Sequence, residues 1–150
     1  MQIDLQTENV AKLIQLALGP VFLISGVGIT LSMLTQRLAR IVDRARKLEE
    51  EREETSSEKK LATIDEDLKV IFRRARHING AIALCTTSAL LTALVVTLLF
   101  ASEFTPIAVG GIIALMFVAS LVCLCLAFLL FLLEVRIATI ALRIGTHRNT

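Results

Sequence analysis

Apolar residues are concentrated in three long stretches of the chain, at residues 13–35, 78–101 and 107–133. Each stretch is longer than the roughly 20 residues that an α-helix needs to cross about 30 Å of hydrocarbon. A buried hairpin of a large soluble protein is the alternative, but a chain of 150 residues cannot enclose three such helices. The pattern therefore predicts an all-α integral membrane protein with three transmembrane helices.

A polar segment with its own helical periodicity separates the first two apolar stretches. Apolar residues recur at steps of three and four on both sides of a polar break, EETSSEKK, at residues 53–60. The first set is Leu34, Leu38, Ile41, Ala45 and Leu48, and the second is Leu61, Ile64, Leu68, Ile71, Ala75 and Ile78. Neither set could be buried alone in water, so we expect an antiparallel helical hairpin whose arms continue the first two transmembrane helices. Thr55, Ser56 or Ser57 can cap the second arm.

The distribution of basic residues predicts the orientation of the chain. Twelve of the sixteen Lys and Arg residues lie between the first two apolar stretches, three follow the third, and Lys12 alone precedes the first. Because basic residues favour the cytoplasmic side, we expect the N-terminus outside and the C-terminus in the cytoplasm. The predicted organisation is an outer N-terminus with transmembrane helix 1 (1–35), a cytoplasmic hairpin (36–77), transmembrane helix 2 (78–101), an outer turn (102–106), transmembrane helix 3 (107–133) and a cytoplasmic tail (134–150).

Charges on the hairpin are sorted by distance from the membrane. Residues 37–47 and 69–77 each carry a net charge of +4, whereas residues 48–68 carry −6. The resulting basic collar comprises Arg37, Arg40, Asp43, Arg44, Arg73, Arg74 and Arg76. Snorkelling and topology explain it most simply; the alternatives are a pocket for anionic lipid headgroups or ion pairs between subunits. The acidic tip and the lack of interleaved aromatic residues argue against a nucleic-acid partner.

Three sequence motifs carry a resemblance to a known family. They are LIQLALGPVFLISGVG at residues 13–28, RLARIVDRAR at residues 37–46 and RRARHINGAI at residues 73–82. Together they resemble a family of small bacterial membrane proteins known as domain of unknown function 2721. The resemblance covers nearly the whole chain and implies three spans in the bacterial inner membrane. It brings no activity and no catalytic residues.

The first apolar stretch contains residues that lipid alone does not favour. Gly19 and Pro20 are expected to kink or loosen the helix and to act as a hinge. Small and polar residues, Ser25, Gly28, Ser32 and Thr35, recur along one side of the helix. They can serve close helix packing within or between subunits, or they can belong to a pore lined by Gln15, Phe22, Ser25, Ile29, Ser32 and Thr35. Three helices cannot enclose such a path, so a pore requires a homo-oligomer.

Signatures of catalysis and of cofactor binding are missing from the sequence, so we expect no enzyme, no metal site and no other cofactor. The two His and three Cys do not occur at ligand spacing, and the glycine pairs lie inside apolar stretches rather than in a phosphate-binding loop. Glu134, at the end of the third stretch, is expected at the membrane interface, where it can pair with an arginine of the basic collar.

Two functional hypotheses follow from these patterns. The first is a homo-oligomeric channel with transmembrane helix 1 lining the pore. Asp4, Glu8 and Glu103 at an acidic outer mouth and the acidic tip inside favour cations, whereas the basic collar between them favours anions. The second is a non-conducting scaffold or regulatory subunit. Its hairpin would bind a cytoplasmic protein partner through the acidic tip, and the basic collar would bind anionic lipid headgroups.

Overall fold

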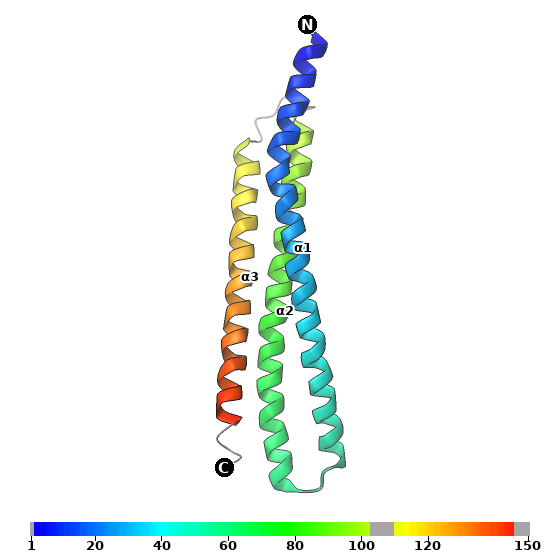
Figure 1. The fold of residues 1–150 in the computed structure, drawn as a ribbon, viewed down its shortest axis with the longest axis vertical. Helices are drawn as coiled ribbons and strands as arrows, with labels where there is room; N and C mark the ends of the chain where they lie inside the picture. Colours follow the sequence, from blue (N-terminus) through cyan, green and yellow to red (C-terminus); the bar gives the residue numbers. More distant parts are fainter. Residues whose placement is uncertain (1, 103–109, 146–150) are drawn as a thin grey trace. The chain divides into compact units, whose positions relative to one another are not determined.

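Three long α-helices make up the described part of the chain, which comprises residues 2–102 and 110–145, with side chains for residues 10–102 and 110–136. In the computed structural model, α1 spans Gln2–Glu54, α2 spans Glu58–Ala101 and α3 spans Gly110–Gly145 (Figure 1). The described residues include no β-strand. All three helices are long and apolar enough to cross a membrane, which confirms the predicted all-α class with three candidate spans.

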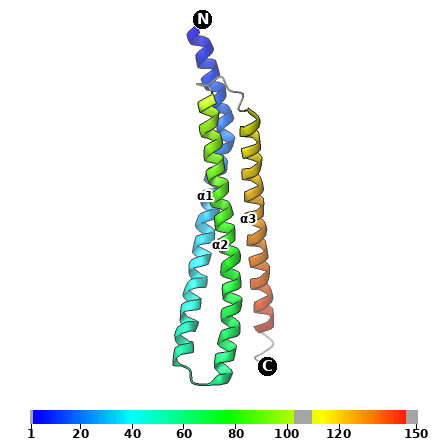
Figure 2. The ribbon, with the colours of Figure 1, turned by 180° about the vertical axis from the view of Figure 1, so that it is seen from behind.

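Helix α1 is drawn as one helix in both views (Figures 1 and 2). Pro20 lies inside this helix and does not interrupt it. Proline has no amide hydrogen, so the carbonyl of Leu16 lacks its usual i→i+4 donor. The helix nevertheless keeps its helical conformation on both sides of Gly19 and Pro20. The hinge function of this pair stays a prediction.

The chain divides into two compact units, each built from segments of all three helices. The first unit contains residues 1–31 and 84–125, and the second contains residues 32–83 and 126–150. In the first unit the buried apolar residues are Ala17, Val27, Cys85 and Val95. They come from α1 and α2, so the two helices bury only a narrow seam and leave their other sides exposed.

The second unit contains the helical hairpin, which is formed by residues 32–54 of α1 and residues 58–83 of α2. Ser57 takes the N-cap position of α2, since its carbonyl accepts the amide hydrogen of Leu61 at 3.0 Å. Every residue of the two predicted apolar sets is buried or half-buried, and the most deeply buried are Leu34, Ile41, Ala45, Ile64, Leu68, Ile71 and Ile78. Near the tip, Nε of Arg52 donates to Oδ1 of Asp65 across the two arms at 2.9 Å. The apolar periodicity thus packs one arm on the other.

Helix α3 packs closely against α2 within the second unit at Gly80. A Cβ atom at this position would lie 3.1 Å from Cδ1 of Leu130, so the missing side chain allows the close approach. Nothing lies within 4 Å of the corresponding point at Gly19, Gly26, Gly28, Gly110 or Gly111. Among these glycines, only Gly80 therefore serves helix packing within the subunit.

Two predicted boundaries differ from the observed helices or fall outside the described residues. Helix α3 continues beyond residue 133, the predicted end of the third span, as far as Gly145. Four of the five residues of the predicted outer turn, 103–106, lie outside the described residues, as do residues 107–109 at the predicted start of the third span.

Replacing Ile71 by Ala tests whether the apolar seam holds the hairpin together. Ile71 is buried, so we expect a loss of about 2 kcal/mol or more in the free energy of hairpin opening. In micelles, amide hydrogen exchange in residues 36–77 should then accelerate by roughly 30-fold. The matched control is Val70→Ala, which shortens the exposed neighbouring side chain. Equal exchange rates in the two variants would contradict the packing of the seam.

Candidate functional site

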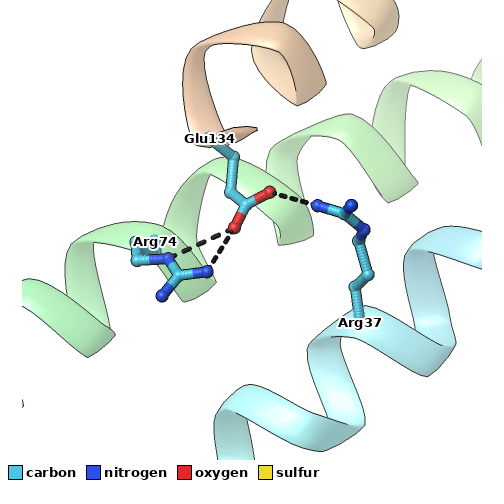
Figure 3. A network of polar contacts seen from close by, with 3 residues as sticks. All are labelled: Arg37, Arg74 and Glu134. Carbon is cyan, nitrogen blue, oxygen red and sulfur yellow. Dashed lines mark hydrogen bonds and ion pairs between the residues drawn. The ribbon is translucent and has the colours of Figure 1, made fainter. Parts of the chain in front are cut away.

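A buried carboxylate on α3 is the centre of the most extensive polar network in the second unit. The side chain of Glu134 is fully buried. Its Oε1 accepts hydrogen bonds from Nε and Nη2 of Arg74 at 3.2 and 2.7 Å, and its Oε2 accepts one from Nη1 of Arg37 at 2.9 Å (Figure 3). Each of the three helices contributes one residue. We call Arg37, Arg74 and Glu134 the ion triad.

The position of the ion triad follows from where the apolar stretches end. Arg37 comes two residues after the first predicted span, Arg74 comes four residues before the second, and Glu134 directly follows the third. Helices that end their apolar stretches at the same boundary bring their first polar side chains to a common level. Packing the three spans in register therefore brings Glu134 to the level of the basic collar, and the rotation of each helix selects Arg37 and Arg74 from it.

Both oxygens of Glu134 accept hydrogen bonds from guanidinium groups, and these bonds lower the free-energy cost of burying its charge. A buried carboxylate without partners costs several kcal/mol, and charge-assisted bonds to guanidinium groups offset that cost. The two arginines remain partly open, with 40% of the Arg37 side chain and 24% of the Arg74 side chain exposed. The guanidinium of Arg37 also lies over the ring of Phe131, 4.9 Å from its centre. Two positive charges thus surround one negative charge, and the triad keeps a net charge of +1.

Only two members of the basic collar take part in the ion triad. Arg40, Asp43, Arg44, Arg73 and Arg76 are exposed, and none of them forms an ion pair with another described residue. The expected pairing of Glu134 with a collar arginine is present within the chain. The sequence did not indicate that two arginines from different helices would share this carboxylate.

The residues predicted to line a pore lie on an exposed side of α1. Gln15, Ser25, Ser32 and Thr35 are exposed, and the side chains of Phe22 and Ile29 are 73% and 70% exposed. Ser25 donates to the carbonyl of Val21 at 3.3 Å, and Thr35 donates to that of Ser32 at 2.9 Å. Such bonds to the helix's own carbonyls make hydroxyl groups inexpensive in a membrane. Packing against α2 or α3 of the same subunit does not explain this set.

A second buried polar group joins α2 and α3 in the first unit. Ser88, Thr92 and Ser120 are fully buried. The hydroxyl of Ser120 lies 3.1 Å from that of Ser88 and 2.6 Å from that of Thr92, and Thr92 donates to the carbonyl of Ser88 at 2.8 Å. Ser120 is the only hydroxyl residue in the third apolar stretch, and this isolation was the available signal. With every hydroxyl bonded, the group stabilises helix packing.

The remaining predicted site residues are those of the acidic outer mouth. The side chains of Asp4 and Glu8 and the whole of Glu103 lie outside the described part of the structure, so the acidic outer mouth stays a prediction. Within the described ranges, no group of three or more His, Cys, Asp or Glu side chains could hold a metal ion.

Three apolar helices, joined by polar groups buried between them, are the features of an α-helical membrane protein. More particularly, the chain belongs to the family described as "Protein of unknown function (DUF2721)", which matches residues 17–144 and so includes the whole ion triad. This match confirms the resemblance carried by the sequence motifs. No curated protein and no solved structure matches the chain.

Replacing Arg74 by Ala tests the contribution of the ion triad to stability. The substitution leaves the buried Glu134 with a single partner, so we expect a loss of about 3 kcal/mol. Arg73→Ala is the matched control, because it removes the same charge from an exposed neighbour and should change stability by about 0.5 kcal/mol or less. Thermal unfolding in micelles, followed by circular dichroism, measures both. A similar melting temperature for the two variants would show that the triad contributes little.

Proposed function

We propose that this protein is a homo-oligomeric membrane channel, passing cations, in which α1 lines the pore. The observation that carries the proposal is the exposed side of α1 with Gln15, Phe22, Ser25, Ile29 and Ser32. We further propose that it resides in a bacterial inner membrane with the N-terminus outside and the hairpin in the cytoplasm. The placement of Lys and Arg supports this orientation.

The geometry of α1 supports the proposal because two of its sides differ in their role. The exposed set is spaced by seven, three, four and three residues, which places its members along one side of the helix. At about 100° per residue, this side is nearly opposite to the one with Ala17, Val27 and Leu34, which are buried within the subunit. The exposed side is thus available to a second subunit or to a central path.

The residue types on the exposed side fit a gated path better than an open aqueous one. Phe22 and Ile29 are seven residues apart and project from the same side. Repeated around a ring, they would form apolar constrictions that close by dewetting. Ser25 lies between them, and Gln15 lies toward the N-terminal side. Selectivity for cations would come from the acidic outer mouth and from the acidic tip of the hairpin. Glu134 also neutralises part of the basic collar, which weakens the attraction of the collar for anions.

The experiment has two stages, because a pore requires several subunits. Native mass spectrometry of the protein in nanodiscs gives the subunit number, and a closed ring of more than two subunits is expected. Bilayer recordings of Ser25→Leu should then show a conductance lowered several-fold, since the added bulk narrows the path. The matched control is Thr97→Leu on α2, an exposed position whose hydroxyl bonds to its own helix at Ala93. A monomer or dimer would contradict the channel, and unchanged conductance in Ser25→Leu would contradict the lining by α1.

A second candidate function is a scaffold or regulatory subunit, and a cleft at the tip of the hairpin favours it. The cleft has a volume of about 720 Å³ and combines charged groups with the apolar side chains of Leu48 and Ile64. Its charged lining residues are Glu51, Glu54, Lys59, Lys60 and Asp67. A cytoplasmic protein partner with a basic and apolar segment would match these groups.

Charge reversal inside and outside the cleft tests the scaffold. Glu51→Lys with Glu54→Lys changes two lining residues, whereas Glu50→Lys with Glu53→Lys makes the same net change on the same helix outside the cleft. A partner identified by cross-linking in cells should be lost from the first variant and kept by the second. Equal loss from both would indicate attraction by overall charge rather than recognition by the cleft.

A further inference from the structure

The ion triad leaves several hydrogen-bond donors of its arginines unused. Glu134 engages Nη1 of Arg37 and Nε and Nη2 of Arg74. Within the described part of the chain, Nε and Nη2 of Arg37 and Nη1 of Arg74 have no acceptor. Since the triad also keeps a net charge of +1, these donors are available to an anion.

Arg37 is held in place before any ligand arrives. One edge of its guanidinium bonds to Glu134, and one face lies over the ring of Phe131, so α3 fixes the group from two directions. Its side chain is still 40% exposed. A free surface arginine loses conformational entropy when it binds a ligand, and an arginine that is already fixed loses less. The triad therefore makes Arg37 a better anion ligand than the other exposed arginines of the basic collar.

The location and chemistry of these donors indicate which anion they would bind. Arg37 lies two residues past the first predicted span, where the phosphate groups of a bilayer are found. The planar guanidinium fork matches the spacing of phosphate oxygens and binds them through two parallel hydrogen bonds. Arg40, three residues after Arg37, and Arg136, two residues after Glu134, are exposed and add positive charge.

We propose that Arg37, fixed by Glu134 and Phe131 and backed by Arg74, forms a binding site for a phosphate oxyanion at the membrane boundary. The phosphate can belong to an anionic lipid headgroup or to a soluble phosphate compound. The site is independent of whether the protein conducts ions.

Spin-labelled phosphatidylglycerol in phosphatidylcholine nanodiscs measures the binding. The fraction of motionally restricted label gives the preference of the protein for phosphatidylglycerol over phosphatidylcholine. Arg37→Lys keeps the charge but removes the fork and the stacking, so the preference should fall by about threefold or more. Arg40→Lys is the matched control, because Arg40 is exposed and forms no ion pair with a described residue, and it should leave the preference unchanged.

A second pair of variants tests the positioning of Arg37 without touching a charge. Phe131→Leu removes the ring beneath Arg37, whereas Phe128→Leu makes the same change at an exposed position one turn earlier on α3. The preference should fall in the first variant and persist in the second. Circular dichroism confirms that each variant keeps its helices. This pair keeps the proposal testable if Arg37→Lys does not fold.

Competition with inorganic phosphate at constant ionic strength distinguishes the two sources of the anion. A preference that depends on Arg37 and resists inorganic phosphate identifies a lipid headgroup as the ligand. Displacement of the labelled lipid by inorganic phosphate, but not by chloride, identifies a site open to soluble phosphates. The proposal is overturned if Arg37→Lys and Arg40→Lys lower the preference equally, or if neither Arg37→Lys nor Phe131→Leu lowers it.

Discussion

The carboxylate of Glu134 is buried away from water, so it requires hydrogen-bond partners from the protein. It follows a stretch of 24 apolar or small residues on α3, residues 110–133, and packing against the hairpin buries it completely. Because an isolated buried charge is so unfavourable, α3 can dock on α1 and α2 only in an arrangement that brings guanidinium groups to both oxygens. The apolar seam of the hairpin is buried in the second unit. Among arrangements that bury this seam equally well, the ion triad favours the one in which both carboxylate oxygens have partners.

The two units use buried polar groups of different strength for related purposes. The first unit joins α2 and α3 through the hydroxyl groups of Ser88, Thr92 and Ser120, which carry no charge and satisfy one another. The second unit uses charged groups, at the level where the predicted spans end and water becomes accessible to the arginines. Neutral bonds suit the interior of a membrane, whereas an ion triad suits its boundary, where the surplus charge of the arginines can be solvated.

Sequence periodicity was sufficient to predict the helices and the hairpin seam, because burial on one side of a helix repeats every three to four residues. The ends of the apolar stretches were sufficient to place Glu134 next to the basic collar. The sequence could not show more of this site. It could not select Arg37 and Arg74 from the collar, since that choice depends on the rotation of α1 and α2 about their own axes relative to α3. The same reason hid the partnership of Ser120 with Ser88 and Thr92. Gly80 was equally hidden, because the sequence contains other glycines in apolar surroundings at which an added Cβ would have no neighbour within 4 Å.

Because α1 is one uninterrupted helix, the direction in which each of its side chains points is fixed by the number of residues that separate it from the others. One inserted residue after Leu34 would rotate everything downstream by about 100°. Ile41 and Ala45 would leave the buried side of the helix, and Arg37 would turn away from Glu134. An insertion of four residues nearly restores the rotation but moves the arginine about 6 Å along the axis, beyond the reach of the carboxylate. Substitutions at exposed positions of this helix are therefore far easier to accommodate than any change in its length.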